Sequence, residues 1–152
     1  MIQKVRKFCE LSLWEKKVFL EAWLTLGIMQ AAIATVSFKR LTRSLQQQKK
    51  NCARVTPLNG RETDIAGSIG GAITRAAANT PWESACLAQS LTAHRMLQRR
   101  SIPGVFYLGV MKDKKSNEKM RAHAWTQCGE AVITGHQGHE AFTVVSVFRW
   151  GQ

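Results

Sequence analysis

Two residues of the sequence have the types and the surroundings that nucleophilic catalysis requires, Cys86 and His123. The pattern predicts Cys86 in the first turn of a helix, where free N–H groups stabilise a thiolate and can face an oxyanion. His123 lies in an alternating segment, 120–127, that is typical of a strand. A sheet packed on the helix could bring the imidazole beside the sulfur, to hold the thiolate and then protonate a leaving amine. The alternatives are a buried cysteine and a core histidine without a catalytic role.

A third group is expected to orient the imidazole. If the hairpin turns at 128–129, His123 falls opposite Thr134, and His136 follows two residues later. No carboxylate lies in this stretch, so Thr134, His136, a backbone carbonyl or a water could take the place, as could Glu140 on the next loop. Thr134 lies on the face of His123, whereas His136 is bulkier but shares that face only if the strand stays regular through Gly135, so we treat the two as equal candidates.

A zinc site is the competing chemistry for the same part of the chain. Cys128, His136 and His139 could bind the metal together with His123. The H-x-x-H spacing is loose, however, and zinc sites show cleaner ligand pairs. We therefore expect no metal and no other cofactor.

The chain is strongly basic, with 22 Lys and Arg against 10 Asp and Glu and a net charge of +12. Residues 1–54 hold 11 of the basic and 3 of the acidic side chains. Such a surface predicts an acidic partner, which could be a nucleic acid, an anionic membrane or an acidic peptide. The basic stretches 39–43 and 49–50 lack interleaved aromatic residues, so no nucleic-acid partner is expected. The N-terminus carries no signal-peptide pattern, so we expect a cytoplasmic protein, with peripheral membrane contact as the open alternative.

The N-terminal part of the chain is predicted to be helical. A capping box at 12–15 starts a helix expected over 13–36. The segment 18–38 is largely apolar, but Glu21 interrupts it, so a buried or membrane-surface helix is favoured over a membrane span. Residues 46–54 are polar and are predicted to form an exposed linker or a frayed helix end.

Two further helices, at 62–78 and 83–100, precede all of the strands, and His94 on the second is expected at the surface. Four strands are predicted, at 105–112, 120–127, 131–135 and 142–150. Helices gathered before strands indicate an α+β fold with a small antiparallel sheet packed on the Cys86 helix. The chain is expected to form one compact unit, with a basic helical segment, 1–54, and a core, 55–152.

An ordered series of motifs runs through the chain. It comprises VSFKR at 36–40, PWESACLAQSL at 81–91, HRMLQRRSIP at 94–103, LGV at 108–110 and AHAW at 122–125. Together these motifs resemble the leader peptidase of lasso-peptide biosynthesis, a transglutaminase-like branch of the papain-type folds. The resemblance covers nearly the whole chain.

The resemblance implies that Cys86 is the nucleophile and His123 the base. Many family members carry an Asp as the third catalytic residue, but its position falls on Gly135, so this role cannot be transferred to the chain. We expect Gly135→Asp, which restores the family's residue, to be tolerated or mildly activating. The chain leaves no room for a leader-recognition domain, which implies a stand-alone peptidase of a split system. It would act on a precursor peptide at the leader–core junction, with a small leader-binding protein and a separate ATP-dependent lasso cyclase. Two alternatives remain: a non-catalytic scaffold of the same fold, and a basic module that binds nucleic acid or a membrane surface.

Overall fold

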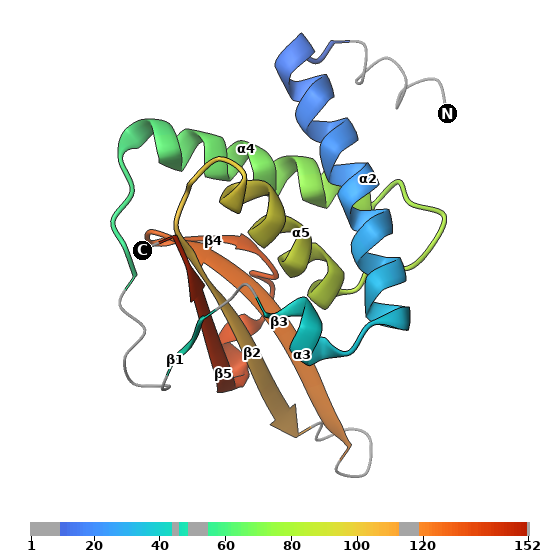
Figure 1. Cartoon of the computed structure of the whole chain (residues 1–152), viewed down its shortest axis with the longest axis vertical. Helices are drawn as coiled ribbons and strands as arrows, with labels where there is room; N and C mark the ends of the chain where they lie inside the picture. The colour runs from blue at the N-terminus through green and yellow to red at the C-terminus, as the bar shows by residue number, and fades with distance from the viewer. Residues whose placement is uncertain (1–9, 44–45, 49–54, 113–118, 152) are drawn as a thin grey trace.

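The structure, a computed structural model, describes residues 10–43, 46–48, 55–112 and 119–151. Three long helices gather on one side of an antiparallel sheet (Figure 1). The helices are α2 (Leu13–Thr35), α4 (Gly60–Ala77) and α5 (Cys86–Gln98). Helices α4 and α5 contact the sheet, and α2 contacts both of these helices. The basic residues at 49–50 lie outside the described part of the chain.

The sheet has five strands in the order β1-β5-β2-β3-β4, and every neighbouring pair is antiparallel. The strands are β1 (Gln46–Gln48), β2 (Gly104–Lys112), β3 (Met120–Cys128), β4 (Ala131–Thr134) and β5 (Thr143–Trp150). Two short helical turns complete the chain, α3 (Phe38–Leu41) and η2 (His139–Ala141). The predicted α+β fold is confirmed. The linker prediction is wrong for 46–48, which pair with β5.

The two faces of the sheet have different environments. Phe106 pairs with Thr126 and Leu108 with Ala124, and Phe106 and Ala124 belong to the core that the helices cover. Side chains alternate along a strand, so His123 points to the opposite face. There it joins an aromatic group with Tyr107 and Trp125.

Helices α2 and α4 both begin with a complete capping box, made by Ser12 with Glu15 and by Asn59 with Glu62. In each box the cap side chain accepts from the backbone of the Glu, and the Glu accepts from the backbone of the cap. These reciprocal bonds satisfy N–H groups that the helix itself leaves free. Helix α5 has no such box, because its N-cap is Ala85.

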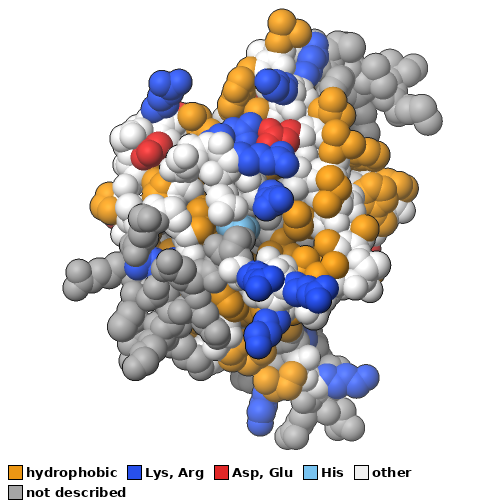
Figure 2. Space-filling model, in the orientation of Figure 1, with side chains coloured by type: hydrophobic (Ala, Val, Ile, Leu, Met, Phe, Trp, Pro, Cys, Tyr) orange, Lys and Arg blue, Asp and Glu red, His pale blue; other side chains and the backbone are white. Residues whose placement is uncertain are grey.

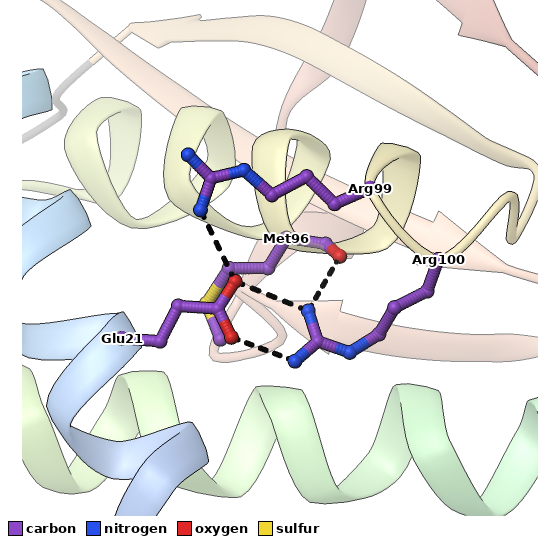
Figure 3. A network of polar contacts seen from close by, with 4 residues as sticks. All are labelled: Glu21, Met96, Arg99 and Arg100. Atoms are coloured by element: carbon purple, nitrogen blue, oxygen red, sulfur yellow. Dashed lines mark hydrogen bonds and ion pairs between the residues drawn. The ribbon is translucent and has the colours of Figure 1, made fainter.

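An ion-pair network joins α2 to the end of α5 (Figure 3). The Glu21 carboxylate accepts from Arg100 at 2.6 and 3.2 Å and from Arg99 at 3.3 Å. Arg100 also donates to the backbone carbonyl of Met96 at 2.9 Å. The hydrogen bond from Arg100 is the largest of the effects that hold the pKa of the Glu21 carboxyl below its usual value. The charge of Glu21 within the apolar helix α2 is therefore paired, and the ion pairs link α2 to the C-terminal end of α5.

The surface prediction for His94 is wrong. His94 is buried, and its ring packs edge-on against Trp150 with a centroid distance of 4.8 Å. Burial, with a smaller contribution from Arg95, lowers its pKa to about 4. The reason is the central place of α5, which has the sheet on one side and helices α2 and α4 on the other. A helix covered on two sides buries positions that a one-sided stripe would leave in solvent.

Candidate active site

Cys86 is the first residue of α5 and is half-buried. The preceding Ala85 has an extended backbone and offers no side-chain acceptor to the first turn. The first-turn N–H groups are therefore not occupied by a cap, unlike those of α2 and α4. Free N–H groups at a helix start, with the positive end of the helix dipole, are suited to a thiolate and to an oxyanion.

The helix begins three residues later than the sequence predicted, and the segment before it explains why. The Thr80 hydroxyl lies 2.8 Å from the Trp82 carbonyl and 2.9 Å from the Ser84 hydroxyl, which holds this segment in a turn. Trp82 packs against Trp23 of α2 with a centroid distance of 5.6 Å. The side chains of Thr80, Trp82 and Ser84 thus hold the segment that precedes α5, and Cys86 occupies the start of the helix.

His123 is held by one hydrogen bond and by two aromatic neighbours. Its Nε2 lies 2.7 Å from the backbone carbonyl oxygen of Gly135. A carbonyl oxygen only accepts, so Nε2 carries the hydrogen and Nδ1 of the neutral ring is left as the base. The ring lies 4.9 Å from that of Phe142 and 5.9 Å from that of Trp125. These contacts fix both the tautomer and the plane of the imidazole.

Gly135 can make this bond because of its backbone conformation. Its φ is +72°, and a Cβ here would meet the Ala124 carbonyl oxygen and would lie 3.0 Å from Trp125 Cβ. A side chain at this position would force either β3 or the Gly135 backbone, whose carbonyl binds His123, to shift. The expectation that Gly135→Asp is tolerated is therefore wrong.

The side chains of Thr134 and His136 have no hydrogen bond to His123 in the described structure. Thr134 is buried, and its hydroxyl lies 3.2 Å from that of Ser90 on α5. His136 is exposed, and its backbone carbonyl accepts from His139 Nδ1 at 2.7 Å. Their predicted roles as third catalytic members stay predictions, whereas the acceptor that the structure provides is a backbone carbonyl.

The predicted hairpin register is wrong, which explains the change of acceptor. Cys128 pairs with Ala131, so the two-residue turn consists of Gly129 and Glu130. Gly129 has a φ of +55°, which suits the first central position of such a turn. An irregularity then makes Thr134 the partner of Thr126 rather than of His123.

Helix α5 and strand β3 run side by side in the same direction. The Thr126 hydroxyl donates to the Ser90 carbonyl at 3.3 Å, and one helical turn further on His94 packs against Trp150, at the Cys128 end of the sheet. Tracing both elements backwards from Ser90 and Thr126 leads to Cys86 and to His123, which lie toward the same end of the sheet, but the His123 side chain points to the face opposite α5. No hydrogen bond joins Cys86 Sγ to the His123 ring in the described structure, so their pairing stays a prediction.

The second described cysteine differs sharply from Cys86. Cys128 is 1% exposed, and burial raises its pKa to about 12. No group of three or more His, Cys, Asp or Glu within the described residues is arranged to hold a metal. A hollow of about 240 Å³ lies between α2 and α4, and neither Cys86 nor His123 lines it; its walls are Trp14, Glu15, Val18, Gly67, Ser68, Gly71 and Arg75.

Residues 32–147 match the family described as the transglutaminase-like superfamily. The chain belongs to this superfamily. Members of the transglutaminase-like superfamily are commonly cysteine peptidases. No curated protein matches the chain, and no solved structure matches it.

Two features of this transglutaminase-like site were not specified by the sequence. The Gly135 carbonyl was only one of several open candidates for the group that orients His123, and its signal is a glycine directly after a strand. The sequence placed Cys86 in the first turn of a helix, but the lack of a side-chain cap there was not predicted. The sequence feature that indicates it is Ala85 at the N-cap position of α5, because the other two long helices have the capping residues Ser12 and Asn59 at that position.

Proposed function

We propose that the chain is a cysteine peptidase that removes the leader from a ribosomally made lasso-peptide precursor. The observation that carries the peptidase part is Cys86 at the uncapped start of α5 in a transglutaminase-like chain. The hydrogen bond from His123 Nε2 to Gly135 supports it, because it leaves Nδ1 as the free base. The ordered motifs around Cys86 and His123 support the leader peptidase as the particular activity.

In the proposed reaction the Cys86 sulfur attacks the carbonyl carbon at the leader–core junction. The negative charge on the carbonyl oxygen is stabilised by N–H groups at the start of α5. His123 takes the thiol proton and gives it to the leaving amine, so the peptide C–N bond breaks and a thioester remains. Water then attacks the thioester, His123 accepts a proton from it and returns that proton to the sulfur, and the leader leaves as a carboxylic acid.

The proposed partners follow from this chemistry. The precursor peptide would be presented by a small leader-binding recognition protein. Cleavage frees the amine of the core, and a separate ATP-dependent lasso cyclase would join that amine to an acidic side chain. No cofactor takes part in the peptidase step.

The test is cleavage of a lasso precursor by the purified chain, with and without the leader-binding protein, read by mass spectrometry. Cleavage should require that protein, and Cys86→Ala should abolish it while leaving the melting temperature unchanged. His123→Ala should be nearly as damaging. Cys128→Ala is the control, because it removes a thiol from the core and should still cleave. Cleavage by Cys86→Ala at the rate of the unmodified chain refutes the peptidase assignment, and full activity without the partner refutes the split system.

A non-catalytic scaffold is the second candidate. It is favoured by the Gly135 position, which has no carboxylate, and by the lack of a hydrogen bond between Cys86 and His123 in the described structure. A thiol probe separates the two candidates near neutral pH. In an enzyme Cys86 should react faster than Cys128, and faster than the thiols of Cys9 and Cys52 outside the described residues. Equal labelling of Cys86 and Cys9, with no cleavage, favours the scaffold.

A further inference from the structure

Helix α2 is apolar on two opposite faces. One face, with Val18, Ala22 and Leu26, is buried in the core. The opposite face carries an aliphatic stripe, defined here as Leu13, Leu20, Leu24 and Ile28, whose exposed fractions are 86%, 56%, 52% and 62%. At 3.6 residues per turn these four positions fall on one side of the helix. A surface helix ordinarily presents polar residues there, so this face has the character of a docking surface.

The charges around the stripe indicate what it docks on. The only carboxylates within α2 are Glu15 and Glu21; the first closes the capping box and the second binds Arg99 and Arg100. Lys17 is exposed at the N-terminal end of the same face. Just past the other end of the helix, Lys39, Arg40 and Arg43 are exposed in and after α3. Figure 2 shows hydrophobic side chains along α2, with Lys and Arg side chains near its two ends.

This pattern fits an anionic lipid surface better than a second copy of the chain. Aliphatic side chains enter the acyl boundary, while flanking Lys and Arg side chains reach the headgroups. Helix α2 is also long and apolar enough to cross a bilayer by length and composition. Two copies paired through α2 would bring the same cations together in a chain of net charge +12, which opposes association.

We propose that the aliphatic stripe of α2 docks the protein on an anionic membrane surface, with its core face still packed on α4 and α5. The helix lies along the bilayer and does not cross it, because Val18, Ala22 and Leu26 remain in the protein core. This proposal goes beyond the peptidase and does not depend on it.

The test is flotation of the full chain with vesicles of phosphatidylcholine alone and of phosphatidylcholine with an equal part of phosphatidylglycerol. The chain should float only with the anionic vesicles. Leu20→Glu/Leu24→Glu should weaken binding by at least about tenfold, because two aliphatic contacts are lost. The matched control is Met120→Glu/Val145→Glu, which changes two other exposed apolar side chains and should leave binding within about twofold after correction for charge.

A second pair of variants tests the charges without touching the stripe. Lys39→Gln/Arg40→Gln/Arg43→Gln should weaken binding by roughly fivefold per charge at low salt. Lys112→Gln/Lys119→Gln/Arg121→Gln removes the same charge from exposed residues at the far end of the sheet and should have a smaller effect. The proposal is overturned by a lack of flotation with anionic vesicles, and also by equal losses of binding for both triple variants. A dimer in solution that Leu20→Glu/Leu24→Glu converts to a monomer overturns it in favour of a second copy.

Discussion

Replacing Gly135 by alanine should damage both the fold and the orientation of His123. The backbone here has a φ of +72°, where an L side chain costs about 1–2 kcal/mol. The new Cβ would also meet the Ala124 carbonyl oxygen, which belongs to β3 and cannot rotate away as a side chain would. Relieving such an overlap costs a further 1–3 kcal/mol, roughly. We expect Gly135→Ala to lower the free energy of unfolding by about 2–5 kcal/mol.

The chain supplies a matched control for this change. Gly138 has a φ of +69°, but nothing lies within 4 Å of a Cβ built on it. Gly138→Ala should therefore lower the free energy of unfolding only by the strain of a side chain at positive φ, about 1–2 kcal/mol. Denaturant unfolding of both variants measures the difference, and precursor cleavage should fall by about tenfold more for Gly135→Ala, since one hydrogen bond to His123 is lost. Equal stability and equal cleavage in the two variants would show that the Gly135 contact with β3 does not position the histidine.

Two more variants follow from features of α5. Ala85→Ser adds a cap and should raise the free energy of unfolding by about 1 kcal/mol while slowing cleavage, because the hydroxyl takes a first-turn N–H group; a faster enzyme would contradict the oxyanion role. The pKa of His94 is about 4 in the folded chain, compared with 6.5 for an exposed histidine. As the pH falls through 6.5, the unfolded chain therefore binds a proton on this residue before the folded chain does, and the free energy of unfolding falls between pH 6.5 and 4. The loss from pH 7 to pH 5 should be about 2 kcal/mol and should disappear in His94→Leu but persist in His136→Gln, as urea midpoints would measure.

The parts of the fold that local pattern specifies could be predicted from the sequence. Helix α4 was expected at 62–78 and lies at Gly60–Ala77, because its apolar residues recur on one face. The four main strands were found within one residue at each end, since their β-branched and aromatic runs end at turn residues. The start of α5 was predicted three residues too early. The hydrogen bonds of the Thr80 hydroxyl, which hold the preceding residues in a turn, leave no trace in the hydrophobic pattern of the sequence.

The rest of the site depends on contacts between elements. A one-residue change in the turn and the irregularity beside Thr126 moved Thr134 away from His123, and neither follows from residue types alone. The burial of His94 was not predicted, because the sequence of α5 does not show on how many sides other elements cover the helix. Cys86, in contrast, could be singled out, because a helix start is a local feature.

The fastening of α2 to α5 through Glu21 has a practical consequence for where the protein can be cut. The family match begins at residue 32, inside α2, so a fragment trimmed to that boundary would split the helix. It would lose Val18, Ala22 and Leu26 from the core and would leave Arg100 without its carboxylate. The helix that carries Cys86 would then have an uncovered apolar flank. A shortened version intended for crystallisation or assay should therefore retain the whole of α2 together with its cap at Ser12.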